Sequence, residues 1–238
     1  MIPKRIHYCW FGRGEMPELA VKCIESWHKH MPDYEYKLWN EDNFDFNKCN
    51  YSKEAYEVGK YAFVSDVARL KALKEEGGIY LDVDFEVFKP FDDLLYYNAF
   101  AGFEGSKTNP VMMGVIGSEP NGEWVSEQLS RYSDRHFVIN GKPDLTTNVR
   151  YITDCMIKEG FCPNGKEQEY KGLHILPVEY FSPKLTTGEY IRTNNTYCEH
   201  LGTSSWANNK PNWKRFLLSF VAPDTRSSII KLKRKLFG

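Results

Sequence analysis

The chain has 238 residues, 42% of them hydrophobic and 15% aromatic, which suffices for the core of one compact domain and excludes a disordered chain. Its 31 basic and 32 acidic residues give a net charge of −1, so overall charge predicts no nucleic-acid partner. We expect neither a signal peptide nor a membrane-spanning helix, because no apolar run approaches about 18 residues. Six scattered cysteines without a Cys-x-x-Cys pair favour reduced thiols in a cytoplasmic protein.

The N-terminal third of the sequence predicts strands and helices in alternation. Apolar periodicity predicts a strand over 2–11, a helix over 17–30 and a strand over 34–39. This order indicates two parallel strands joined by a crossover helix. Residues 54–76 then predict one broken helix or two consecutive helices, and Gly77 or Gly78 can end the second in the left-handed conformation.

The rest of the chain continues the alternation, so we predict a single α/β domain. A strand is expected over 79–88, where Pro90 stops it. Further short strands are predicted over 99–103, 111–116 and 173–177, and further helices over 122–132 and 145–158. A polar loop over 193–206 precedes a segment over 213–221 and a basic tail. We place the domain at 1–222 and the tail at 223–238.

Two aspartates, Asp82 and Asp84, are the most informative residues of the strand expected over 79–88. Side chains alternate along a strand, so residues two apart should point the same way. Neighbouring carboxylates repel each other unless a cation lies between or beside them, and Mg²⁺ or Mn²⁺ suits such oxygens and often shares them with a phosphate. The pair therefore predicts a metal–diphosphate site, the alternative being two solvated carboxylates.

Three more residues are candidates for binding a ligand beside that pair. Asp66 and Arg69 are three apart on the predicted helix upstream and share one face. They form either a local salt bridge or a polar pair that meets a sugar or ribose, with Arg69 also able to bind a phosphate. Trp10 closes the first strand, where it either packs at the rim of the core or stacks on a nucleobase.

A polar segment late in the chain carries a further set of candidates. His200 and Ser204 could complete the ligand shell of a cation, although a single histidine is more often simply hydrogen-bonded. Trp206 could cover a bound ligand, and Gly202 would give this loop mobility.

Four segments, taken in chain order, identify a family resemblance. They are Ile2-Pro3-Lys4-x-Ile6-His7-x-x-Trp10, Ser65-Asp66-x-x-Arg69, Gly77-Gly78-x-Tyr80-x-Asp82-x-Asp84, and His200 with Ser205-Trp206. In these residues the chain resembles the glycosyltransferases with a sugar-binding region containing a DXD motif. That family includes the fungal initiating α-1,6-mannosyltransferase and bacterial capsular polysaccharide enzymes. The resemblance is dense over the first 90 residues and loose over about 92–183.

The resemblance implies a GT-A fold, which is a Rossmann-like mixed sheet flanked by helices, and a basic helix would follow at the C-terminus. It also implies a nucleotide-sugar donor, a divalent metal that is usually Mn²⁺ (or Mg²⁺), and retention of anomeric configuration. In that family's terms Asp84 would ligate the metal on the diphosphate, and Asp82 would contact ribose or sugar and reach the metal through water. Asp66 would bind donor hydroxyls, and Arg69 would hold the sugar or phosphate.

The remaining site residues also follow from the resemblance. Trp10 would stack on the base, His200 would be a late metal or phosphate contact, and Ser204 with Trp206 would close over the β-phosphate. The family often has two adjacent histidines where this chain has His200-Leu201, and a Thr-Gly-Pro segment where this chain has Thr146-Thr147-Asn148. Asn148 is accordingly a candidate sugar contact.

We therefore predict a metal-dependent retaining hexosyltransferase that uses a nucleotide sugar, by default UDP-hexose. The acceptor would be a glycan or a lipid-linked oligosaccharide in capsule or surface polysaccharide synthesis. Breaking the sugar–phosphate bond leaves a diphosphate with growing negative charge, which a metal and Arg69 would stabilise. Retention requires a nucleophile or a front-face route, and although Glu104 is a candidate we assign no nucleophile.

The C-terminal tail and the aspartate pair each leave an alternative open. From Arg226 onward the sequence has five basic and no acidic residues, among apolar ones. Residues 226–238 are thus either a solvated end or a peripheral anchor on anionic lipid at the inner face of the cell membrane. A metal-dependent phosphohydrolase with Asp82 as nucleophile is the alternative activity, although such enzymes usually place a small hydroxyl residue after the pair, where this chain has Phe85.

Overall fold

The computed structural model describes residues 1–202. The predictions for Ser204, Trp206, the segment over 213–221 and the tail over 223–238 fall outside the described residues. The boundary at 222 and the membrane contact through 226–238 therefore stay predictions. Within residues 1–202, no helix is long and apolar enough to cross a membrane.

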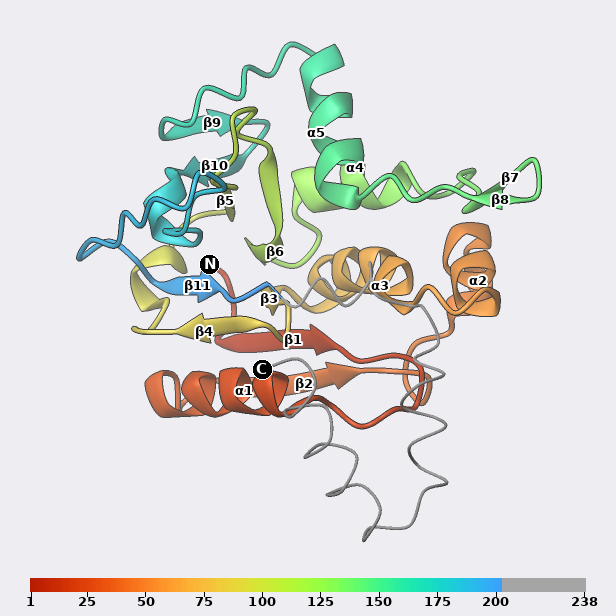
Figure 1. Ribbon diagram of the computed structural model, residues 1–238, viewed down its shortest axis with the longest axis horizontal. Helices are drawn as coiled ribbons and strands as arrows, with labels where there is room; N and C mark the ends of the chain where they lie inside the picture. The colour runs from red at the N-terminus through yellow and green to blue at the C-terminus, as the bar shows by residue number, and fades with distance from the viewer. Residues whose placement is uncertain (203–238) are drawn as a thin grey trace, which may run out of the picture. The chain divides into compact units, whose positions relative to one another are not determined.

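A mixed seven-stranded sheet forms the centre of the molecule (Figure 1), as predicted. Its strands, in spatial order, are β2 (Glu35–Trp39), β1 (Arg5–Cys9), β3 (Gly78–Leu81), β6 (Val111–Ser118), β5 (Ala99–Phe103), β10 (Leu173–Leu176) and β9 (Gln168–Tyr170). β1 runs parallel to both β2 and β3, and β5 runs parallel to β10. β6 is antiparallel to β3 and β5, and β9 is antiparallel to β10. The parallel pair β1–β2 with α1 between them confirms the predicted crossover.

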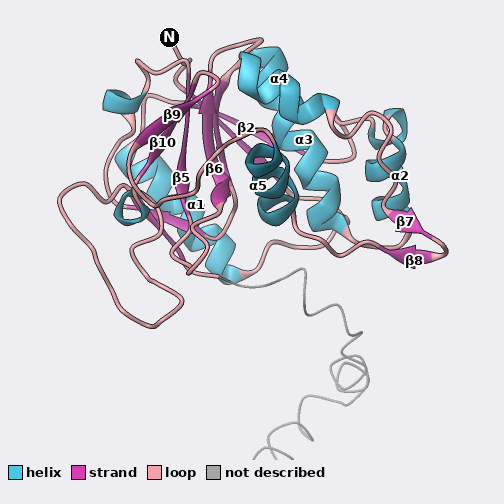
Figure 2. Cartoon of the chain, turned by 90° about the horizontal axis from the view of Figure 1, so that it is seen from above, coloured by secondary structure: helices cyan, strands magenta, loops and turns pink. Residues whose placement is uncertain are grey.

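Helices cover both faces of this sheet. They are α1 (Glu18–His30), α2 (Asn50–Glu57), α3 (Tyr61–Glu76), α4 (Glu123–Ser130) and α5 (Asn148–Lys158), with short 3-10 turns at Phe46–Lys48, Asp92–Leu94 and Val178–Tyr180. Figure 2 shows α2, α3, α4 and α5 gathered on one side of the sheet. On β3, Tyr80 packs into the core on that side, whereas Ile79 and Leu81 pack into the second core with Trp27 of α1. Strand alternation thus divides the apolar residues between two layers.

The strand expected over 79–88 is wrong as a single element. β3 ends at Leu81, and the backbone N–H of Phe85 donates to the carbonyl of Asp82 (3.2 Å), which closes a turn. A separate strand, β4 (Phe85–Val87), then pairs antiparallel with β11 (Cys198–His200), as Figure 1 shows. Aspartate favours turns because its side chain competes for nearby backbone groups, and this preference outweighs the apolar pattern that suggested one strand.

The other predicted elements agree with the structure to within a few residues. Residues 54–76 form the two consecutive helices α2 and α3. The first strand is shorter than the predicted 2–11, and the helix predicted over 145–158 begins at Asn148, after Thr147 caps it. A small hairpin of β7 (Val138–Ile139) and β8 (Lys142–Pro143) was not predicted, because its two-residue strands carry too little pattern.

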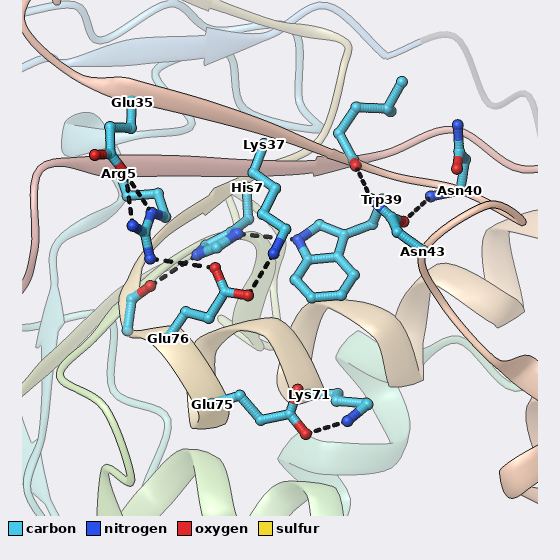
Figure 3. Close-up of polar contacts among 12 residues, drawn as sticks. Arg5, His7, Glu35, Lys37, Trp39, Asn40, Asn43, Lys71, Glu75 and Glu76 are labelled. Atoms are coloured by element: carbon cyan, nitrogen blue, oxygen red, sulfur yellow. Dashed lines mark hydrogen bonds and ion pairs between the residues drawn. The ribbon is translucent and has the colours of Figure 1, made fainter.

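Gly77 and Gly78 join α3 to β3, and both have positive φ (63° and 110°), as predicted for the end of this helix. A Cβ atom on Gly78 would lie 2.6 Å from the carbonyl oxygen of Arg5. The close approach lets the buried His7 of β1 reach both neighbours (Figure 3): His7 Nε2 bonds the Gly77 carbonyl at 2.7 Å, and Trp39 Nε1–H donates to His7 Nδ1 at 2.9 Å. The end of α3 is thereby fixed against β1 and β2.

Candidate functional site

Arg69 of α3 is the centre of a buried polar cluster at the end of β3. Both Arg69 and Asp66 are 5% exposed. Arg69 Nη2 lies 3.2 Å from Asp66 Oδ1 and 3.4 Å from Asp82 Oδ1, so one guanidinium joins two carboxylates. Arg69 also donates to the carbonyls of Met113 (2.6 Å) and Ser65 (3.2 Å), which fix its position. The predicted contact between Asp66 and Arg69 is confirmed, and both side chains point toward Asp82.

Tyr80 is a member of this cluster that the sequence interpretation missed. Its hydroxyl donates to Asp82 Oδ1 at 2.6 Å, and Arg69 Cζ lies 4.5 Å from the centre of its ring. The signal was available, because Tyr80 lies two residues before Asp82 and strand alternation directs both to the same face.

Burial sets the protonation of these groups. It raises the pKa of Asp66 to about 7, although the positive charge of Arg69 opposes the increase. Burial also raises the pKa of Asp82, again against Arg69, and the charge of Asp84 adds to the effect. Burial by itself would lower the pKa of Arg69, but the charges of Asp82, Tyr80 and Asp66 together outweigh it and raise that pKa. The guanidinium therefore stays charged between two acids.

Asp84 belongs to a second pair beside the cluster. His200 on β11 stacks on Phe85, with ring centres 4.7 Å apart and planes 9° apart, because the strand register places these two residues opposite each other. His200 Nε2 lies 3.3 Å from Asp84 Oδ2. Burial lowers the pKa of His200, but the hydrogen bond and charge of Asp84 outweigh it and raise that pKa. The structure thus brings Asp84 together with a residue more than a hundred positions away.

The aspartate pair is arranged differently from the sequence prediction. Asp82 and Asp84 do not share one face of a strand, because the turn at 82–85 separates them. Asp82 faces Arg69 and Tyr80, whereas Asp84 faces His200. The two carboxylates therefore belong to two neighbouring groups of side chains and not to one pair.

The donor chemistry of Asp84 and His200 fits a divalent cation, although the residues do not form a complete cage. Within residues 1–202, no three His, Cys, Asp or Glu side chains converge as a metal site. Mg²⁺ and similar ions usually take only one or two protein carboxylates and complete their shell with water and substrate phosphates. A carboxylate with an adjacent imidazole is therefore an adequate protein half of such a site.

Of three further candidates, two follow the carboxyl ends of strands and one begins a helix. Trp10 follows the end of β1, parallel to β3, and its indole N–H donates to the carbonyl of Gly14 (2.7 Å). Glu104 follows the end of β5 and is half-buried; burial raises its pKa, His200 opposes this, and Asp82 adds to it. Asn148, the first residue of α5, is 7% exposed. The carboxyl edge of the sheet thus collects most of the predicted residues.

A separate hollow of about 500 Å³ lies away from this cluster, in the loops after β2. Three carboxylates line it, those of Glu41, Asp42 and Asp45, against the single cation of Arg13. Since Arg13 Nη2 is already paired with Asp42 at 2.7 Å, the hollow would repel a diphosphate.

A mixed sheet with helices on both faces and an acidic turn at the carboxyl end of a central strand is the GT-A arrangement. Among solved structures, the one titled "PaToxG Glycosyltransferase" has a TM-score of 0.51 at 21% identity, covering 67% of this chain and 70% of that one. Residues 17–101 match the family described as "Glycosyltransferase sugar-binding region containing DXD motif". The chain belongs to this family of glycosyltransferases.

Two fungal proteins are similar to nearly the whole chain. "Glucan organizing enzyme 1" of Cryptococcus neoformans var. grubii is 32% identical over 249 aligned residues, covering 93% of this chain and 66% of that protein. "Inositol phosphoceramide mannosyltransferase 2" of Schizosaccharomyces pombe is 26% identical over 235 residues, covering 93% of this chain and 64% of that protein. The chain therefore spans no more than about two thirds of either relative.

Proposed function

We propose that this protein transfers a hexose from a nucleotide sugar to a glycan or lipid-linked oligosaccharide, with a divalent metal and with retention of configuration. The observation that carries the proposal is the buried Arg69 held between Asp66 and Asp82, next to the pair of Asp84 and His200. The cluster around Arg69 offers carboxylates that can accept hydrogen bonds from hydroxyls, together with a fixed cation. The pair of Asp84 and His200 offers metal ligands. A nucleotide sugar needs both, because it joins a polyhydroxylated ring to a diphosphate.

Each side chain has a role that its position supports. Asp84 and His200 would hold Mn²⁺ or Mg²⁺, and Asp82 would be reached through water. Bound there, the cation would neutralise charge on the diphosphate. Arg69 is preorganised by two backbone carbonyls, so its charge is available to the leaving group without rearrangement. Asp66 and Asp82 accept hydrogen bonds from sugar or ribose hydroxyls, and Trp10 offers a ring face to the base.

For the donor and the acceptor we propose chemical classes and not single compounds. UDP-hexose is our default donor, but a relative named as a mannosyltransferase makes GDP-mannose the main competitor. That relative's name includes inositol phosphoceramide, and this supports a lipid-linked acceptor here. A role in capsule or surface polysaccharide synthesis, a cytoplasmic location and closure of Ser204 and Trp206 over the donor belong to the same proposal.

A donor panel tests the proposal. Purified protein is incubated with Mn²⁺ and UDP-glucose, UDP-galactose or GDP-mannose, and release of the nucleoside diphosphate is followed. We expect turnover of one donor, and loss of about 100-fold or more in Asp84→Asn, because the metal-binding carboxylate is removed. Asp154→Asn is the matched control, since Asp154 lies on the exposed face of α5 with its side chain 54% exposed.

One outcome would favour the phosphohydrolase instead. If no donor is bound or turned over, and an aryl phosphate is cleaved with loss in Asp82→Asn, the transferase proposal is wrong. The position of Asp82 argues against that outcome. Its carboxylate would have to attack phosphorus, yet both of its oxygens already accept hydrogen bonds, from Tyr80 and from Arg69.

A further inference from the structure

Several buried polar atoms of the described residues have no hydrogen-bond partner, and half of them lie in one region. Among residues 1–202 they are Tyr51 Oη, Tyr132 Oη, Arg135 Nη1, Asn148 Nδ2, Trp124 Nε1 and Gln128 Nε2. An unpaired buried donor costs stability, so native proteins keep few of them, and each calls for a reason. Tyr51, Tyr132 and Arg135 are in direct contact with one another.

These three side chains form an internal aromatic cluster. Tyr51 of α2 and Tyr132, just after α4, have ring centres 5.0 Å apart. The guanidinium carbon of Arg135 lies 4.6 Å from the centre of the Tyr51 ring and 3.6 Å from that of Tyr151 on α5. Arg135 Nη2 donates to Asp144 at 3.0 Å, which leaves Nη1 as the unpaired end.

The cluster lies behind Asp66. The charge of Asp66 contributes to the raised pKa of both Tyr51 and Tyr132, after burial, and the charge of Arg135 acts on Asp66 in turn. The charge of Arg69 acts in the opposite direction on the pKa of Tyr132. Figure 2 shows α2, α3, α4 and α5 packed on the same side of the sheet, and the three residues come from α2 and from the segment that follows α4.

Packing alone does not explain the two hydroxyls. Phenylalanines fill equivalent places in the same core, since the Phe137 ring lies 5.4 Å from Tyr51 and 4.8 Å from Phe63. A phenylalanine at 51 or 132 would keep the ring contacts without burying an unpaired hydroxyl. The hydroxyls therefore need a partner that residues 1–202 do not supply.

We propose that Tyr51, Tyr132 and Arg135 form the inner wall of the sugar pocket and that they read the hydroxyls of the transferred hexose together with Asp66. The inference rests on the proposed function and adds residues that set sugar specificity. Two hydroxyls that donate and accept, an N–H donor and a carboxylate suit a polyhydroxylated ring. Tyr51 and Tyr132 are almost fully buried, so the proposal requires their side chains to adjust when the ring enters. A site built on such bonds rejects the epimer that cannot make them.

Tyr51→Phe and Tyr132→Phe test the inference because each removes one hydroxyl and keeps the ring. Affinities for UDP-glucose, UDP-galactose and GDP-mannose are measured by calorimetry with Mn²⁺, each against UDP or GDP alone. We expect nucleotide affinity to be unchanged, affinity for the preferred nucleotide sugar to fall about tenfold, and discrimination between epimers to shrink. The Tm of each variant should be unchanged or higher, because no hydrogen bond within the protein is lost.

Tyr170→Phe is the matched control, since the Tyr170 hydroxyl donates to Glu159 (3.1 Å) on the exposed side of β9. The inference is overturned if both test variants keep the wild-type ratio of nucleotide-sugar to nucleotide affinity, whether or not Tm falls. A fall in Tm with that ratio unchanged would identify the hydroxyls as partners of internal water. If the wild-type protein binds no nucleotide sugar, the proposed function and this inference both fail. If the wild type binds one and the variants keep its affinity ratio, the inference alone is overturned.

Discussion

His7, beside the junction of α3 and β3, and Asp66, on α3, are both buried polar residues, yet their surroundings differ. Both ring nitrogens of His7 are bonded, one to the Gly77 carbonyl and one to Trp39, as Figure 3 shows. Around Asp66, by contrast, Tyr51, Tyr132 and Arg135 keep unpaired polar atoms. The fold completes the hydrogen bonds of His7, whereas the described residues leave those around Asp66 incomplete, which is the basis of the proposed sugar contact.

The tautomer of His7 follows from its neighbours. The indole N–H of Trp39 can only donate, so His7 Nδ1 must accept, and Nε2 carries the proton that the Gly77 carbonyl accepts. A second proton on the ring would point at the indole N–H. Burial also lowers the pKa of His7. Although this histidine belongs to the family motif near Trp10, its contacts are those of a structural residue.

The largest effect is expected at Arg69. Arg69→Met leaves Asp66 and Asp82 buried without their shared cation, so unfolding free energy should fall by about 3–5 kcal/mol, and donor turnover should drop by at least about 100-fold. Urea unfolding and nucleoside diphosphate release measure the two. Arg150→Met, at an exposed position on α5, should change neither. A fully stable and active Arg69→Met would show that the cluster serves neither folding nor turnover.

Substitution of the glycine at the α3–β3 junction should have an intermediate effect on the unfolding free energy. Gly78→Ala should lower unfolding free energy by about 2–3 kcal/mol, because the new Cβ would approach the Arg5 carbonyl and φ is positive. Gly172→Ala is the control, since Gly172 has a similar φ of 76° but nothing within 4 Å of an added Cβ; about 1 kcal/mol is expected there. Equal losses in the two variants would mean that backbone conformation alone, and not the close approach, requires Gly78.

The smallest expected effects are on the pH dependence of the unfolding free energy, which should differ in sign between His7 and Asp66. The folded pKa of His7 lies below its ordinary value of 6.5, so the unfolded chain binds more protons there, and the stability associated with His7 is lost as pH falls below about 6.5. The folded pKa of Asp66 is raised from 3.8 to about 7, so its contribution is lost as pH rises across that interval. Each slope should not exceed about 1.4 kcal/mol per pH unit.

Metal-free urea unfolding between pH 4.5 and about 8 measures these slopes. The difference between wild type and His7→Phe should grow with pH, and the difference between wild type and Asp66→Asn should move in the opposite direction. If the two differences in unfolding free energy changed with pH in the same direction, the distinction drawn between His7 and Asp66 would be wrong.

Local pattern was enough to predict much of the fold and part of the site. The spacing of Asp66 and Arg69 on one helix predicted their contact, because helix geometry fixes which residues share a face. The two glycines predicted the end of α3. The turn after Asp82 was missed because a run of apolar residues on both sides gave the signal of one strand, and no local feature opposed it except the aspartates themselves.

Contacts between distant segments were harder to predict. His200 was a candidate from its polar segment and from the family resemblance, but nothing near it in sequence indicates a strand that pairs with β4. Tyr51, Tyr132 and Arg135 look like ordinary core or surface residues on their own elements. Only tertiary packing brings them together, and only the unpaired atoms distinguish them from their phenylalanine neighbours.

The pairing of β4 with β11 also has a consequence for the nascent chain. Asp84 emerges from the ribosome long before His200, and the strand that carries His200 is the last one that the structure describes. A nascent chain that has not reached Cys198 contains Asp66, Arg69, Asp82 and Asp84 but not the imidazole beside Asp84. Synthesis order thus delays assembly of the pair until the other strands of the described residues have been made.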